Sequence, residues 1–375
     1  MKRIITLVFW VVVALAMTSS KPHPASGTGN PASMLKDRKQ AKTIASLRDV
    51  SDGHLYEMTY KADYMLQDFI DADLRSQDML RMAIQEKLLA VPQDIRMESP
   101  KPACAAFQAV TPEGDVIYCR NFDYIFKDSG TIVLHSRPRK AYKSLSLVSS
   151  SFVGVDGKCL RDGETDLSVL MGVPYMQMDG MNEKGFAVSV LELSHRCAIQ
   201  KEPGKHDIMT SVMIRMLLDR AATVDEALEM LGDYNYWADG EQKGVRVQSS
   251  YHFLLSDATG KTCVLEYILE DGPRGKGKWV MNVIEDKAVT NSYLSKGWEK
   301  TCGVDRRLPS ICKALDSCGG VLSEEEAMAV LDSVHQTRDR KNISGTVWSV
   351  VYNLSKGTAT VCVNHDYSKK FRFKI

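Results

Sequence analysis

The sequence predicts an α+β protein in which two antiparallel sheets pack on each other and are flanked by layers of helices. Apolar β-prone runs joined by short polar turns fill residues 104–193 and 250–292 and return at the end of the chain. Two segments near 209–231 and 324–334 instead carry apolar residues at helical spacing. Hairpins with helices grouped outside them favour sheets that bury one face against each other.

Residues 1–20 have the pattern of an export signal. Lys2 and Arg3 form a positive start, residues 4–17 an apolar run, and residues 16–20 a small-residue stretch that suits cleavage. Fourteen apolar residues are short for a bilayer, so we expect removal of the signal and no stable membrane span afterwards. Residues 21–37, rich in Ser, Pro, Gly and Ala, are expected to be a disordered linker. The protein is therefore predicted to be exported, as a secreted, periplasmic or cell-surface protein.

Residues 38–103 have a pattern of their own. From Tyr56 to Leu89, apolar residues recur at helical spacing, which predicts a helical layer packed on the core. Pro92, Pro100 and Pro102 end that pattern and lead an extended chain to Cys104. If the chain is cut before Cys104, this layer is also a propeptide or an N-terminal subunit, and residues 104–375 form the main domain.

A hairpin begins at Cys104. The runs 104–110 and 115–119 flank Thr111-Pro112-Glu113-Gly114, where Pro at the second position and Gly at the fourth suit a type I turn. Folding back about this turn brings Cys104 opposite residues 120–121, close to Arg120 and Asp123. A cation beside a thiol favours the thiolate, and a carboxylate can orient a nearby amine. Strict alternation puts Arg120 and Asp123 on opposite faces, so a bulge or a strand end is expected there.

The composition excludes several classes of protein. A net charge of +1 with dispersed Lys and Arg leaves no basic surface for nucleic acid. The nine cysteines are too sparse for a disulfide scaffold, and no pairing is assigned. No Cys-x-x-Cys pair, histidine cluster or glycine-rich phosphate loop occurs, so neither a metal nor another cofactor is expected.

The order of several motifs resembles a family of amide hydrolases. Arg120 follows Cys104 by sixteen residues within Arg-Asn-x-Asp, similar to the start of the N-terminal-nucleophile amide hydrolases, which include choloylglycine hydrolase, penicillin V acylase and acid ceramidase. Further motifs similar to that family follow in order, at residues 179–185, 250–268, 290–291, 305–307 and 346–352. The resemblance implies the fold of that family, a four-layer αββα sandwich, for a catalytic domain over residues 104–375.

In that family the cysteine is catalytic once it is the first residue of its chain. A free α-amine, with a pKa of roughly 7.7–8.0, can act as a base at neutral pH, whereas an amide nitrogen cannot. A cut between Ala103 and Cys104 would thus create the base and free the nucleophile in one event. Attack on a linear amide then forms an acyl-thioester, which water or another acceptor resolves.

The resemblance also implies roles for the supporting residues. Arg120 is expected against the sulfur, Asp123 at the α-amine, and Asn291 with its amide NH2 facing the oxyanion. Arg306 matches the second arginine that the family places near the nucleophile. Arg307 is expected to be a surface residue.

The resemblance aligns Glu192 with an asparagine of the bile salt enzymes. The acid ceramidase branch resembles this chain in having a glutamate at that position. An ionised carboxylate repels an oxyanion, so Glu192 either stays protonated through burial or contacts the leaving amine. The methionine-rich stretch 170–181 is either an acyl pocket or plain core, and core is the more common outcome for such stripes.

Together these residues predict an exported cysteine amidase that hydrolyses an N-acyl conjugate: a bile salt, an N-acyl amine or amino acid, or a penicillin V-like amide. An acyltransferase of the same fold and a non-catalytic exported binding protein are the alternatives, and sequence alone does not separate hydrolysis from acyl transfer. The expected partner is a small-molecule N-acyl amide. A homo-oligomer or a heterodimer of the cleaved halves is left open.

Overall fold

The computed structural model describes residues 35–90, 103–125, 130–238, 241–242, 245–246, 250–303, 305–337 and 344–375. The predicted export signal, most of the linker and the proline-containing segment 91–102 lie outside the described residues. Among the helices of the described part, none is long and apolar enough to cross a membrane.

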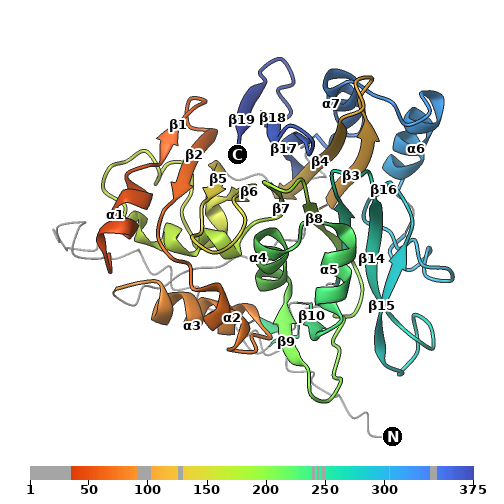
Figure 1. Cartoon of the computed structure of the whole chain (residues 1–375), viewed down its shortest axis with the longest axis horizontal. Helices are drawn as coiled ribbons and strands as arrows, with labels where there is room; N and C mark the ends of the chain where they lie inside the picture. The colour runs from red at the N-terminus through yellow and green to blue at the C-terminus, as the bar shows by residue number, and fades with distance from the viewer. Residues whose placement is uncertain are drawn as a thin grey trace, which may run out of the picture. The chain divides into compact units, whose positions relative to one another are not determined.

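One sheet has nine strands in the order β1-β2-β5-β6-β7-β8-β13-β14-β15 (Figure 1). Its strands are β1 (Arg48–Asp49), β2 (Leu55–Tyr60), β5 (Thr131–Ser136), β6 (Ser144–Ser149), β7 (Asp179–Asn182), β8 (Ala187–Leu193), β13 (Ser250–Ser256), β14 (Thr262–Leu269) and β15 (Trp279–Ile284). A second sheet has six strands in the order β16-β3-β4-β17-β18-β19. They are β16 (Ala288–Val289), β3 (Ala103–Val110), β4 (Val116–Ile125), β17 (Ser344–Asn353), β18 (Thr358–Val363) and β19 (Phe371–Lys374).

Helices and two short strand pairs surround these sheets. The helices are α1 (Arg38–Ile44), α2 (Leu66–Ile70), α3 (Gln77–Lys87), α4 (Thr210–Arg220), α5 (Val224–Leu231), α6 (Arg307–Ser317) and α7 (Glu324–Ser333), with 3-10 turns η2 (Ser150–Val153) and η3 (Leu167–Tyr175). The strand pairs join β9 (His206–Met209) to β10 (Tyr234–Trp237), and β11 (Glu241–Gln242) to β12 (Val245–Arg246).

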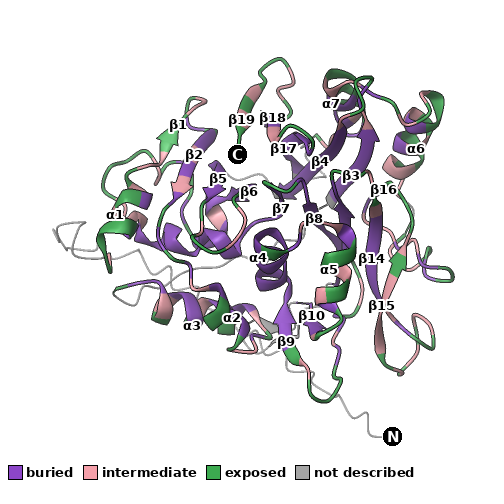
Figure 2. Ribbon diagram, viewed as in Figure 1, coloured by how far each residue is buried: buried purple, intermediate pink, exposed green. Residues whose placement is uncertain are grey.

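The two sheets pack face to face between helices, as predicted. Tyr118 on β4 donates from its hydroxyl to the main-chain oxygen of Leu254 on β13, at 3.0 Å, and so crosses between the sheets. Helix α4 packs on β7 and β8, whereas α6 contacts β3 and β16 and α7 contacts β4 and β17. Figure 2 shows the resulting pattern, with burial concentrated in the strands and exposed residues on the outer sides of α5, α6 and α7. The αββα order of layers is therefore confirmed.

The segment before Cys104 differs from the helical layer predicted for residues 38–103. Leu55–Tyr60 forms β2, and this strand pairs in parallel with β5, so the larger sheet is not wholly antiparallel. Tyr56, Met58 and Tyr60 are buried at alternate positions, which is the period of a strand, and aromatic residues favour that state. The predicted helices are present as α1, α2 and α3, and the prediction is wrong for residues 55–60, where burial has the period of a strand.

The hairpin that begins at Cys104 forms as β3 and β4. Gly114 donates its N–H to the carbonyl oxygen of Thr111 at 2.8 Å and has a φ of +91°, which closes the predicted turn. Cys104 pairs with Phe122, one residue beyond the predicted register. The expected irregularity lies in the neighbouring strand β17, whose register shifts between Thr346 and Trp348.

Candidate functional site

The Cys104 thiol lies between the two sheets, at the start of β3. It is fully buried, and Nη2 of Arg120 donates to its Sγ at 3.1 Å. Arg120 points into the same space because it stands two residues from Phe122, the cross-strand partner of Cys104. The predicted contact between this arginine and the sulfur is present.

Asp179 is the ion-pair partner of Arg120. Its Oδ2 lies 3.0 Å from Nε of Arg120, and neither side chain is exposed. The indole N–H of Trp348 donates to Oδ2 at 2.9 Å and the hydroxyl of Tyr352 donates to Oδ1 at 2.5 Å. Sequence reasoning had not singled out Asp179, although it opens the motif at 179–185. This carboxylate neutralises the guanidinium that faces the thiol.

The Cys104 thiol is neutral in the uncut chain. Burial raises its pKa to about 12, and the opposing charge of Arg120 does not compensate for the loss of solvent. Arg120 does favour the thiolate, as the sequence predicted, but burial has the larger effect in the uncut chain. A base close to Sγ is needed before this thiol can act as a nucleophile.

Asn291 contacts the other side of the cysteine. Its side-chain Oδ1 accepts the main-chain N–H of Cys104 at 2.5 Å, and its Nδ2 donates to the carbonyl oxygen of Glu192 at 2.8 Å. The nitrogen that a cut before Cys104 would convert to an α-amine is thus already held by a side-chain acceptor. Asp123, which was expected to hold this nitrogen, has other partners.

The arginine pair at the start of α6 is the reverse of the prediction. Arg307 donates from Nη1 to Asp123 at 2.6 Å and from Nη2 to Asn291 Oδ1 at 2.7 Å, with its side chain only 12% exposed. Arg306 is exposed, at the position before the helix. The main-chain N–H of Arg307 donates to Asp305 at 2.9 Å, so Asp305 determines where the helix begins and which arginine turns inward.

Asp123 lies on the opposite face of β4 from Arg120, where the chain nears the bulge in β17. Its Oδ2 accepts from Arg307, and its Oδ1 accepts from the Thr346 hydroxyl at 2.5 Å. Burial raises the pKa of Asp123 to about 6, although Arg307 and Thr346 act in the opposite direction. Asp123 therefore anchors Arg307, and through Arg307 it supports Asn291.

Glu192 is almost fully buried near the end of β8, opposite Tyr251. Strand alternation puts its side chain on the face away from Ser189, whose hydroxyl meets Tyr118 between the sheets. The contact that links Glu192 to Asn291 is its main-chain carbonyl. The role predicted for the Glu192 carboxylate stays a prediction.

Most of the methionine-rich stretch is core. Met171, Val173 and Tyr175 are fully buried. Met176 and Met178 also contact a cavity of about 20 Å3, whose other lining residues include Phe152 and Val190. Phe152 packs edge-on against Phe122, the cross-strand partner of Cys104.

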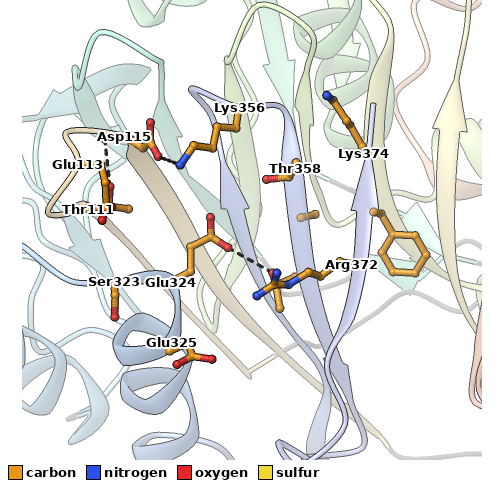
Figure 3. A pocket seen from close by; sticks show the side chains of 13 residues that line it. Thr111, Glu113, Asp115, Ser323, Glu324, Glu325, Lys356, Thr358, Arg372 and Lys374 are labelled. Carbon is orange, nitrogen blue, oxygen red and sulfur yellow. Dashed lines mark hydrogen bonds and ion pairs between the residues drawn. The ribbon is translucent and has the colours of Figure 1, made fainter.

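A larger hollow of about 730 Å3 lies at the other end of the six-stranded sheet, beside the turn at 111–114. Figure 3 shows acidic side chains from the hairpin turn region and from α7 facing basic ones from the turn between β17 and β18 and from β19; they are Glu113, Asp115, Glu324 and Glu325, and Lys356, Arg372 and Lys374. It contains none of the residues around Cys104.

Within the described residues, neither the other cysteines nor possible metal ligands form a second site. The structure contains all nine cysteines as free thiols. Within the ranges that the structure describes, no three His, Cys, Asp or Glu side chains are arranged to hold a metal ion.

Comparisons with known proteins agree with the position of the cysteine. Residues 104–271 match the family described as linear amide C–N hydrolases, choloylglycine hydrolase family. The chain is 33% identical over 148 residues to penicillin V acylase from Pectobacterium atrosepticum, covering 37% of this chain and 38% of that protein. The match thus spans little more than a third of that relative's length.

The fold is similar to solved structures of conjugated bile acid hydrolase from Clostridium perfringens. One variant of that enzyme has a TM-score of 0.52 at 17% identity, and another has 0.50 at 16% identity. Both comparisons cover 72% of this chain and 92% of the other. At this identity the similarity establishes the N-terminal-nucleophile fold.

Proposed function

We propose that this protein is an exported cysteine amidase, because residues 104–271 match the choloylglycine hydrolase family of linear amide C–N hydrolases. It hydrolyses the linear amide bond of an N-acyl conjugate through an acyl-thioester on Cys104. The observation that carries the proposal is the pair of contacts on one residue: Arg120 at the sulfur and Asn291 at the nitrogen of Cys104.

The proposal requires a cut between Ala103 and Cys104. In the uncut chain the thiol has a pKa of about 12, and the nitrogen beside it is an amide that cannot take a proton. Hydrolysis of this bond leaves a carboxylate on Ala103 and an α-amine on Cys104. The new amine has a pKa of roughly 7.7–8.0, so at neutral pH it can accept the proton of Sγ.

Each of these contacts then serves one step of the proposed reaction. Asn291 Oδ1 orients the amine, which takes the thiol proton while Sγ attacks the substrate carbonyl. We assign the Asn291 amide NH2, which also donates to the carbonyl oxygen of Glu192, to the oxyanion. The amine returns its proton to the leaving nitrogen, and water then attacks the thioester and releases the acid. Arg120, held by Asp179, keeps its positive charge beside the sulfur throughout.

The proposed substrates are N-acyl amides whose acyl group is apolar. Phe152, which packs against the cross-strand partner of Cys104, lines a small cavity with Met176 and Met178, although polar residues such as Gln177 and Ser211 line it as well. The relative from Pectobacterium is a penicillin V acylase and the structural neighbours are bile acid hydrolases. An aryloxyacetyl amide, a bile acid conjugate and a fatty acyl amide are therefore the three classes to test.

We further propose that the segment before the cut stays bound as a second chain. Strand β2 lies inside the nine-stranded sheet, beside β5, and its Tyr60 donates to the carbonyl oxygen of Met171 at 2.9 Å. Tyr64 donates to both oxygens of buried Asp219, at 2.8 and 2.7 Å. A cut at Cys104 breaks none of these contacts.

Mass spectrometry and an activity screen test the proposal together. The mature wild type should show two fragments divided at Ala103–Cys104 that elute together, and Cys104→Ala should remain one inactive chain. The processed protein should hydrolyse one of the three amide classes. Activity in a protein whose Ala103–Cys104 bond is intact would contradict the cleavage mechanism. A processed protein that hydrolyses none of the three amide classes would contradict the proposed amidase activity.

A further inference from the structure

A buried histidine lies behind the Asn291 loop and takes no part in the contacts described above. His252 lies on β13, and Glu266 faces it from the neighbouring strand β14, with neither residue exposed. The ring Nδ1 lies 3.2 Å from Glu266 Oε1. The ring Nε2 lies 2.6 Å from the main-chain oxygen of Thr290, the residue before Asn291.

Both ring nitrogens of His252 therefore face hydrogen-bond acceptors. The Thr290 carbonyl can only accept, and Glu266 is ionised: burial favours its neutral form, but hydrogen bonds from His252 and Ser295 and the charge of His252 lower the pKa of Glu266 below its ordinary value. Because a carbonyl oxygen only accepts, Nε2 of His252 is the donor in the contact with Thr290, and Nδ1 faces Glu266.

The same glutamate fixes the other side of the loop. Glu266 accepts the main-chain N–H groups of Leu294 at 2.7 Å and Ser295 at 3.0 Å, and also the Ser295 hydroxyl. The His252–Glu266 pair thus holds residues 290–295 on both sides of Asn291. Such a loop has little freedom to move its amide relative to Cys104.

We propose that His252 is a positioning residue that acts through Asn291. By donating to Thr290 while paired with Glu266, it holds the Asn291 side chain at the distance from Cys104 that the amidase needs. The inference deepens the proposed function and rests on it. A misplacement of about 1 Å in such a group can cost roughly 10²-fold in rate, so this support has a measurable effect.

The neighbouring titratable groups leave this ion pair undisturbed. Tyr293 and Cys302 both interact electrostatically with Glu266. Burial raises the pKa of Tyr293 above its ordinary value and that of Cys302 to about 11, so both are neutral at pH 7. Glu266 is therefore the charged group that faces His252.

A double-mutant cycle on the processed protein tests the proposal. Asn291→Ala should lower kcat by roughly 10²–10³, and His252→Ala should lower kcat by about 10² with KM little changed. If His252 acts through Asn291, the double variant should be no slower than Asn291→Ala alone. Losses that multiply, or a His252→Ala enzyme with the kcat of the wild type, would overturn the inference.

A second buried histidine provides the matched control. His135 on β5 is 5% exposed and its Nε2 lies 2.9 Å from Glu57 on β2, so it forms the same kind of pair far along the sheet from Asn291. His135→Ala removes an equally buried imidazole. It should lower the melting temperature and leave kcat per folded molecule within about twofold of the wild type.

Nitrogen NMR of the labelled ring gives a readout that needs neither a substrate nor the alanine variant. Nε2 of His252 should carry a proton in the wild type, because it donates to the carbonyl oxygen of Thr290. An Nε2 without a proton would overturn the inference. A wild type with a protonated Nε2 but no amidase activity would instead count against the proposed function.

Discussion

The two ends of strand β3 differ in almost every physical respect. At one end Cys104, Arg120 and Asp179 are all fully buried, and the charges face one another without solvent. At the other end, roughly 20 Å away along the strand, the turn borders an open hollow in which Lys356 pairs with Asp115 at the surface (Figure 3).

The protonation behaviour of the two ends differs because only one of them is shielded from solvent. Hydrogen bonds from Lys356 and Asn353 lower the pKa of Asp115, as is usual for a hydrated carboxylate with donors. Burial instead raises the pKa of Asp123 to about 6 and that of the Cys104 thiol to about 12 at the closed end. The pKa of Asp123 thus moves toward neutrality and that of Cys104 moves away from it, so burial by itself does not activate the thiol. The loss of solvent around the charges, and not the size of a hollow, causes these shifts.

The largest effect is expected from the arginine that links the groups of the closed end. Arg307→Ala leaves the Asp123 carboxylate buried without its cation and removes a donor from Asn291, so unfolding should become easier by about 3–5 kcal/mol. Turnover per folded molecule should fall at least tenfold. Arg306→Ala, one residue earlier and exposed, is the matched control and should change neither. Equal losses in the two variants would contradict the assignment of Arg307 to the site.

The pH dependence of stability should reveal the raised pKa of Asp123. Between about pH 4 and pH 6 the folded state keeps a proton on Asp123 that the unfolded state has lost, so this group makes the protein less stable as the pH rises. Asp123→Asn removes this titration. The free energy of unfolding of the wild type, relative to that of Asp123→Asn, should fall across this window and level off above it. Parallel curves from denaturant titrations would show that Asp123 has an ordinary pKa.

Glu192 should have a smaller effect, confined to the pH profile. If burial on β8 raises its pKa, one limb of the rate profile should lie above the free value of about 4.3. Glu192→Gln keeps the size and the main-chain bond to Asn291, so it should flatten that limb and leave alkylation of Cys104 nearly unchanged. Identical profiles for the two proteins would mean that only the main chain of Glu192 matters.

The smallest effect is expected at the open end. Lys356→Ala removes an exposed ion pair of the kind that is usually worth about 0–1 kcal/mol. Turnover should stay at the wild-type level, since no residue near Cys104 contacts Lys356. A tenfold loss of activity would show that the hollow takes part in the reaction and would remove the contrast between the two ends.

The hairpin could be predicted from the sequence because its determinants are local. A Pro–Gly turn between β-prone runs needs only neighbouring residues, and the pairing of β3 with β4 placed Arg120 beside Cys104. The prediction for α7 holds for a similar reason. Ser323 and Glu326 form a capping box three residues apart, and apolar residues follow at helical spacing.

The partners of these elements depended on residues far apart in the chain. Asp179, the ion-pair partner of Arg120, lies 59 positions farther along the chain. No periodicity in the sequence indicates that these two residues meet. Which of Arg306 and Arg307 turns inward depends on where α6 begins, because consecutive helical residues point about 100° apart. Asp305 determines that start.

By itself, then, the sequence determined the order of the elements, the hairpin and the place of Cys104 beside Arg120, since turn chemistry and side-chain periodicity act over a few residues. Only the tertiary structure decided that β2 joins the large sheet, that Arg307 holds Asn291, and that Cys104 is a neutral thiol in the uncut chain. These three outcomes depend on burial and on ion pairs between distant segments. Both arise when the sheets close on each other and remove water from the charges between them.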